Sequence, residues 1–274
     1  MRGAEIICYA PHMPFIERDD ETKFYYEEAG GGGPPLLFVH GIGCNLHDFE
    51  PLMAAFQARH RVVAVDLRGH GMSSATPEGL ALEDHVADVR WLCRELGLHR
   101  PILIGHSLGG IVGVELSRET PPLLSGVVSL DGAICLPAAA WEGLAGLIAS
   151  LHGDDWRQHF VQGIGGYADP TRNPQRHRYL LDRATSTPQV TFTRAFDTVA
   201  RWQADAALSA SRLPLLYVAS MLPVDEERLL RLKPDVRIER VKAGHYPHVE
   251  AFDEVLGVIH SFLSTVASTR QPSS

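Results

Sequence analysis

The stretch LIGHSLGGI, residues 103–111, places Ser107 between Gly105 and Gly109, directly after an apolar run. Glycine is unfavourable inside a strand or a helix because it loses the most backbone entropy on folding. Glycines two places on either side of one serine therefore indicate a backbone turn that a Cβ atom would obstruct. We predict a sharp strand-to-helix turn that raises the serine hydroxyl above the edge of a sheet. The alternative is an ordinary turn in which Ser107 only caps the following helix.

Strand and helix patterns alternate on both sides of this turn. Two alternating segments, 13–18 and 23–30, predict an antiparallel pair of strands. The apolar runs predict buried strands at 36–40, 61–66, 101–107, 124–131, 213–220 and 236–244. Amphipathic spacing predicts helices at 48–60, 82–96, 108–120, 225–232 and 252–266. This order indicates an α/β fold, with a mostly parallel sheet and helices on both of its faces.

One segment interrupts the alternation. Residues 133–211 are helical or irregular, which is too long for an ordinary loop and predicts an inserted subdomain. We therefore assign 13–132 and 212–267 to the sheet domain, and we expect flexible termini at 1–12 and 268–274.

Composition and charge exclude several classes of function. The 274 residues carry a formal net charge of −8 and no basic block, so a nucleic-acid partner is not expected. The four cysteines form no CxxC pair, which favours a reduced, cytoplasmic setting. No apolar run is long enough for a membrane span, and no membrane partner is expected. The expected partner is a small-molecule substrate; the oligomeric state stays open, with a homodimer as one option.

Two further segments supply the groups that a reactive serine needs. FVHGIG, residues 38–43, follows a predicted strand, so the N–H groups of Ile42 and Leu108 could both bind a developing oxyanion. AGHYPHVE, residues 243–250, follows the last strand and offers a general base. His245 stands directly at the end of that strand, and His248 lies three residues further on. We predict His245 as the base.

The motifs HGIG, DLRGHGMS (66–73), GHSLGG and AGHYPHVEAFDEV, in this order, resemble those of the α/β-hydrolase family. The resemblance covers the chain except residues 1–12 and the C-terminal tail. It implies that residues 133–211 form the helical cap of the family. It also implies that Asp66 and Arg68 hold the loop after the fourth strand.

The chain departs from the family at the acid of the catalytic triad. Most members carry this acid after the strand that here reads LLYVAS, where this chain has Leu222. Asp131 ends the preceding strand, 24 residues after Ser107. Haloalkane dehalogenases, zearalenone lactonases and cofactor-free ring-cleaving dioxygenases are similar in placing the acid there. We predict Asp131 as the acid; Asp225 is the alternative, with a helix N-cap as its other role.

The resemblance implies a serine hydrolase that cleaves a carboxylic ester or lactone through an acyl-serine, with no metal or organic cofactor. Dehalogenases use aspartate as the nucleophile, so Ser107 argues against that reaction. Two other hypotheses stay open: cofactor-free dioxygenase chemistry carried by the His/Asp pair, and a non-catalytic receptor. The cap aromatics favour an apolar or aromatic substrate, although each ring could equally join cap and sheet domain. They are Trp141, Trp156, Phe160, Tyr167, Phe192, Phe196 and Trp202.

Overall fold

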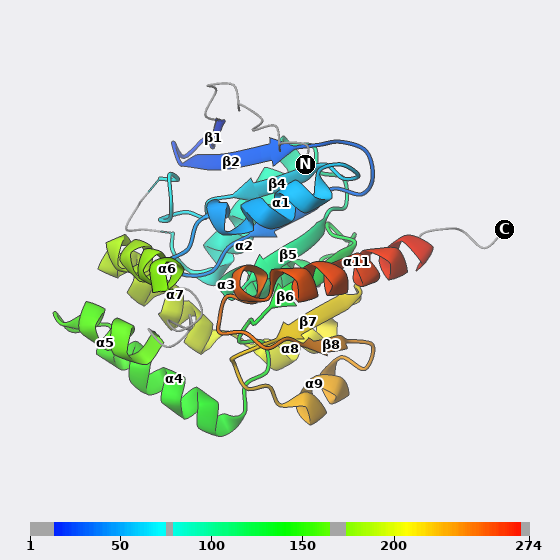
Figure 1. Ribbon diagram of the computed structural model, residues 1–274. Helices are drawn as coiled ribbons and strands as arrows, with labels where there is room; N and C mark the ends of the chain where they lie inside the picture. The colour runs from blue at the N-terminus through cyan, green and yellow to red at the C-terminus, as the bar shows by residue number, and fades with distance from the viewer. Residues whose placement is uncertain (1–13, 75–78, 165–173, 270–274) are drawn as a thin grey trace.

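A computed structural model describes residues 14–74, 79–164 and 174–269 of the chain (Figure 1). In this part of the chain the strands form one eight-stranded sheet with the order β1-β2-β4-β3-β5-β6-β7-β8. The strands are β1 (Phe15–Glu17), β2 (Lys23–Ala29), β3 (Leu36–Val39), β4 (Val62–Val65), β5 (Ile102–His106), β6 (Gly126–Leu130), β7 (Leu215–Ala219) and β8 (Arg237–Arg240). Strands β1 and β2 pair antiparallel, and β2 pairs antiparallel with β4. The pairs from β4 to β8 are all parallel. The predicted α/β fold class is confirmed.

Some of the helices cover the two faces of this sheet, and others belong to the insertion between β6 and β7. The helices are η1 (Leu46–Phe49), α1 (Glu50–Phe56), α2 (Leu82–Glu95), α3 (Leu108–Leu116), α4 (Ala138–Ser150), α5 (Trp156–Ile164), α6 (Pro174–Ser186), α7 (Gln189–Arg201), α8 (Ala204–Ala210), α9 (Glu226–Leu232), α10 (Pro247–Glu250) and α11 (Phe252–Thr269). Figure 1 shows α1 and α11 on one face, with α2 and α3 behind the sheet.

Alternating side chains of the central strands build a hydrophobic core on each face. On β5, Ile102 and Ile104 join the cluster that contains Phe56 and Phe262, from α1 and α11. Leu103 points the other way, into the cluster formed with α2 and α3. A strand buried on both faces must be apolar at every position, which explains the continuous apolar runs of the sequence.

The described part of the insertion between β6 and β7 contains α4 to α8. Leu151, Trp156, Phe160, Ala184 and Phe192 form a small buried cluster within it. Figure 1 shows α4 to α7 gathered on one side of the sheet. The carboxyl ends of the parallel strands lie along one edge of the sheet. Open α/β sheets bind their ligands outside this edge.

The C-terminal boundary of the sheet domain differs from the expectation, and some predicted segments lie outside the described residues. Helix α11 runs to Thr269, so Ser268 and Thr269 are helical rather than part of a flexible tail. The expected flexible segment 1–12, the rest of the tail from residue 270, and Tyr167 lie outside the described residues. Among the helices of the described ranges, none is long and apolar enough to cross a bilayer.

Candidate active site

The turn around Ser107 has the strained backbone that the glycine pattern predicts. Strand β5 ends at His106, α3 begins at Leu108, and Ser107 between them has φ +51° and ψ −114°. Left-handed backbone at a non-glycine residue costs on the order of 1–3 kcal/mol, and such strain gathers at functional sites. A Cβ atom on Gly105 would overlap the Gly109 carbonyl group, and one on Gly109 would overlap the Val39 carbonyl oxygen. Only glycine fits at both positions.

The loop after β3 lies against this turn. A Cβ atom on Gly41 would stand 2.8 Å from the Cβ of Ser107, so the Gly41–Ile42 peptide is beside the serine. The Gly41 carbonyl accepts hydrogen bonds from His40 Nδ1 (2.8 Å) and from the Cys44 N–H (3.2 Å). His40 Nε2 accepts from the Leu67 N–H at 2.9 Å, which places the His40 proton on Nδ1. The peptide that carries the Ile42 N–H is therefore held in one orientation.

The second proposed oxyanion donor is the N–H of Leu108. Leu108 is the first residue of α3, and the first N–H groups of a helix have no partner within the helix. They also stand at the positive end of the helix dipole. A negative charge that develops next to Ser107 would therefore meet a favourable environment.

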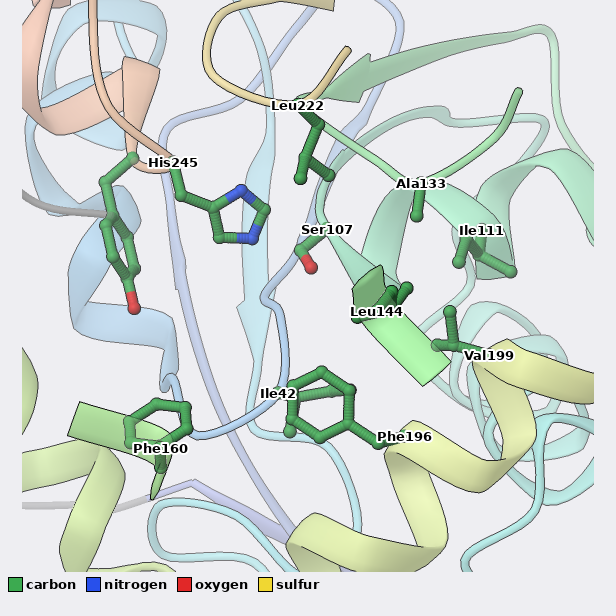
Figure 2. Close-up of a pocket in the computed structure, with 11 residues that line it drawn as sticks. Ile42, Ser107, Ile111, Ala133, Leu144, Phe160, Phe196, Val199, Leu222 and His245 are labelled. Atoms are coloured by element: carbon green, nitrogen blue, oxygen red, sulfur yellow. The ribbon is translucent and has the colours of Figure 1, made fainter. Parts of the chain in front are cut away.

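His245 and Asp131 come together although 114 positions separate them in the sequence. The Nδ1 atom of His245 lies 2.8 Å from Oδ2 of Asp131, whose side chain is fully buried. Figure 2 shows the other ring nitrogen of His245 on the side of Ser107. The backbone carbonyl of His245 also accepts a hydrogen bond from His106 Nε2 at 2.6 Å. The structure thus places Ser107, His245 and Asp131 in the order that a catalytic triad requires.

The loop after β7 holds the Asp131 carboxylate. Oδ1 of Asp131 accepts the backbone N–H groups of Ser220 (2.9 Å), Met221 (3.1 Å) and Leu222 (3.2 Å). Asp131 itself has φ +47° and directly follows β6. The loop after β7, where the family resemblance would place the triad acid, here supplies backbone N–H donors instead. These hydrogen bonds compensate for the cost of burying the Asp131 carboxylate.

Asp225 and His248, the alternatives for the acid and the base, make other contacts. Asp225 is the N-cap of α9, and its Oδ1 accepts the Arg228 N–H at 3.0 Å. The buried ring of His248 stacks on Phe49, with 4.8 Å between ring centroids.

The expected roles of Asp66 and Arg68 agree with their contacts: Asp66 accepts two loop N–H groups, from Leu46 and Met72. Arg68 forms a bidentate pair with Asp88.

The pocket next to Ser107 is mostly apolar (Figure 2). It is lined by Ile42, Ser107, Ile111, Ala133, Leu144, Phe160, Phe196, Val199, Leu222, His245 and Tyr246. Of the cap aromatics, Phe160 and Phe196 face the pocket. Trp156 packs with Phe192 inside the cap, and Phe192 also lies against Gly43 of the loop after β3. The Trp202 Nε1–H donates to Glu115 of α3 at 2.6 Å. The rings therefore divide between lining the pocket and joining the cap to the core.

Sequence reasoning missed several groups around this site. His106 lies inside the stretch LIGHSLGGI, but nothing in the pattern shows that it donates to the His245 carbonyl. Tyr246, next to the predicted base, lines the pocket. Arg183, in α6, donates to the Gly43 carbonyl at 3.3 Å, and a sequence separation of 140 residues hides this contact.

Buried histidines give the fold a pH dependence. Burial lowers the pKa of His70 to about 4 and that of His85 to about 3, and holds those of His40 and His106 well below 6.5. Below pH 6.5 these four histidines therefore bind more protons in the unfolded chain than in the folded chain. Their contribution to stability is present above pH 6.5 and is lost as the pH falls toward their folded pKa values.

We expect His85→Leu to reduce the stability lost between pH 7 and pH 5 by about 2 kcal/mol, from 1.36 kcal/mol per pH unit below 6.5. Both His85 ring nitrogens are buried without a hydrogen-bond partner in the described part of the chain, so leucine removes the titration and no hydrogen bond. The leucine side chain would take the place of the ring that packs edge-on against His70, with 6.5 Å between centroids. The measurement is the urea midpoint at both pH values. The exposed His99→Leu is the control, and an equal loss in wild type and His85→Leu would contradict the prediction.

Comparison with known proteins gives the class. A family model described as "alpha/beta hydrolase fold" matches residues 34–165. The Magnesium-chelatase 30 kDa subunit of Rhodobacter capsulatus is 35% identical over 261 residues, which cover 83% of this chain and 86% of the relative. The chain belongs to the α/β hydrolase fold family. It is an enzyme of the α/β hydrolase class.

One further relative and one solved structure carry names of specific activities. The 2-(acetamidomethylene)succinate hydrolase of Mesorhizobium japonicum is 42% identical over 96 residues, which cover 35% of this chain and about a third (34%) of that protein. The enol-lactonase from Burkholderia xenovorans LB400 superposes with a TM-score of 0.81, at 19% identity, over 92% of this chain and 100% of that chain. At this identity the likeness shows the fold.

Proposed function

We propose that this enzyme is a serine hydrolase that cleaves a carboxylic ester or lactone of an apolar small molecule through an acyl-serine intermediate. The observation that carries the proposal is the 2.8 Å contact between Asp131 and His245, with the other ring nitrogen of the imidazole on the side of Ser107. A serine hydroxyl is a weak nucleophile until a positioned base removes its proton. The name of the relative from Mesorhizobium japonicum, a hydrolase, supports the same chemistry.

The reaction follows from this geometry. His245 Nε2 takes the hydroxyl proton while the Ser107 oxygen attacks the substrate carbonyl carbon. The carbonyl oxygen becomes an oxyanion, which the N–H groups of Ile42 and Leu108 bind. The protonated His245 then gives its proton to the leaving alkoxide, and the acyl group stays on Ser107. Water, activated by the same imidazole, hydrolyses the acyl-serine and restores the enzyme.

The substrate class follows from the pocket. Besides Ser107, His245 and Tyr246, its lining side chains are aliphatic or phenyl groups. Such walls favour a hydrocarbon portion, and the described lining residues include no Asp, Glu, Lys or Arg to pair with a charged substrate group. We therefore propose an ester or lactone whose acyl or ring portion is apolar.

Two measurements on the purified protein test this function together. The first is hydrolysis of p-nitrophenyl butyrate, and the second is covalent labelling by an alkyl fluorophosphonate, located by peptide mass spectrometry. We expect turnover and a single label on Ser107. Turnover without a label on Ser107, or absence of both, would contradict the proposal.

Substitutions at Ile42 test the oxyanion donor. Only the N–H of Ile42 is proposed to act, so we expect Ile42→Val to change kcat little. Ile42→Pro removes this donor and is expected to lower kcat by at least about 10². The kcat for p-nitrophenyl butyrate is measured for both variants, with circular dichroism as the folding control. Equal losses in the two variants would assign the effect to the side chain instead.

A further inference from the structure

The loop that carries the Ile42 N–H is clamped by the cap. Gly43 has φ +70°, and a Cβ atom there would lie 2.7 Å from Cζ of Phe192 and 3.2 Å from Cβ of Ala184. Ala184 belongs to α6 and Phe192 to α7. Both cap helices therefore pack directly on the backbone of Gly43.

Arg183, the neighbour of Ala184 on α6, adds polar contacts from the cap to this loop. Its Nε donates to the Gly43 carbonyl oxygen at 3.3 Å, and its Nη1 donates to Asp48 Oδ1 at 2.6 Å. Nη1 also approaches Asn45 Oδ1 at 3.4 Å. The side chains of Arg183 and Asp48 are 11% and 1% exposed, so water screens this ion pair little.

The contacts of Arg183 continue as a chain of peptide groups toward Ser107. The carbonyl of Gly43 and the N–H of Cys44 belong to one peptide unit. That N–H donates at 3.2 Å to the carbonyl of Gly41. The Gly41 carbonyl in turn shares its peptide unit with the Ile42 N–H. Hydrogen-bonded amides in series orient and polarise one another, so a cation at the far end strengthens the last donor.

We infer that Arg183 is a positioning residue for catalysis: through the 43–44 and 41–42 peptide units it orients and polarises the Ile42 N–H. This inference rests on the proposed function, because it needs an oxyanion at that N–H. It assigns the cap a part in the chemical step, in addition to forming one wall of the pocket. Arg183 itself is absent from the pocket lining, so its removal should leave substrate binding nearly unchanged.

The test compares three variants. Arg183→Met with Asp48→Asn removes the cation without leaving a buried carboxylate unpaired, which would by itself destabilise the fold. Arg183→Lys keeps the charge but lacks the planar fork that reaches Gly43 and Asp48 together. Arg178→Met makes the same change on the exposed face of α6 and is the matched control. Active enzyme is counted by fluorophosphonate titration, so that a smaller folded fraction does not lower kcat.

We expect the double variant to lose about 10- to 100-fold in kcat for p-nitrophenyl butyrate, with KM changed less than about threefold. Arg183→Lys should lose about 3- to 10-fold, and Arg178→Met nothing. The Ki of a trifluoromethyl ketone, which forms a tetrahedral oxyanion adduct with serine, should rise in parallel with the fall in kcat/KM. The Ki of the corresponding methyl ketone, which stays trigonal, should not change. If Arg183 had a purely structural role, the kcat of the titrated enzyme would not change. The Ki of the trifluoromethyl ketone relative to that of the methyl ketone would not change either.

The kcat of the double variant decides the inference if its circular dichroism spectrum matches that of the wild type; otherwise the kcat of Arg183→Lys decides. A value within twofold of the wild type overturns the inference. If turnover persists in Ser107→Ala, the proposed function fails and the inference fails with it. If turnover depends on Ser107 but not on Arg183, only the inference fails.

Discussion

Ser107→Ala is expected to lower kcat for ester hydrolysis by about 10⁶, the loss that removal of the nucleophile causes in a comparable triad. The strained turn should persist, because alanine keeps the Cβ atom and the contacts of Gly105 and Gly109 do not involve the hydroxyl. The melting temperature should therefore stay close to that of the wild type. Steady-state turnover of p-nitrophenyl butyrate and a thermal melt measure the two quantities.

The control is Ser117→Ala, the same change at the far end of α3. The Ser117 hydroxyl donates to the Val114 carbonyl and to Ser211, and none of these residues lines the pocket, so its loss should affect stability and leave kcat unchanged. If Ser107→Ala keeps more than about a tenth of the activity, the acyl-serine mechanism is wrong. Oxygen uptake with a quinolone-type substrate that survives Ser107→Ala would favour the dioxygenase hypothesis instead.

Asp131→Asn is expected to lower kcat by up to about 10⁴, the cost of the wrong imidazole tautomer. The three backbone N–H groups of residues 220–222 would keep the Asn oxygen where Oδ1 of Asp131 lies now. The amide nitrogen would then face His245 Nδ1 and donate to it. The imidazole proton would move to Nε2, which could no longer accept the proton of Ser107. The kcat of the purified variant, with its melting temperature, is the measurement.

Asp225→Asn is the matched control. It changes the same side-chain type at the N-cap of α9, and asparagine caps a helix about as well, so we expect about 1 kcal/mol or less of lost stability and an unchanged kcat. An inactive Asp225→Asn beside an active Asp131→Asn would reverse the assignment of the acid.

The fold and the nucleophile turn could be predicted because local patterns determine them. Continuous apolar runs such as 36–39 fit only strands buried on both faces, and glycines around a single serine fit only a tight turn. Asp131 could be singled out because a carboxylate directly after a buried strand needs partners. Those partners, however, are backbone N–H groups of residues 220–222, and backbone donors leave no trace in side-chain identity.

The contacts of the cap were beyond sequence reasoning for a different reason. Phe160 and Phe196 line the pocket, whereas Trp156 and Phe192 pack inside the cap. All four are aromatic residues in amphipathic segments, so only tertiary packing distinguishes them. Arg183 looks like an ordinary arginine near a helix C-terminus, and its contact with Gly43 joins residues far apart in the chain.

The connection of the cap to the sheet has a consequence for protein engineering. The insertion leaves β6 and returns at β7, and these two strands pair side by side, so its ends are about one strand spacing apart. Such a junction permits a foreign lid to be inserted without displacing the neighbouring strands of the sheet. Yet a transplanted lid would arrive without the guanidinium that reaches Gly43. Recombination between hydrolases of this class should therefore yield folded but slow chimaeras, unless an arginine is reinstated opposite Asp48.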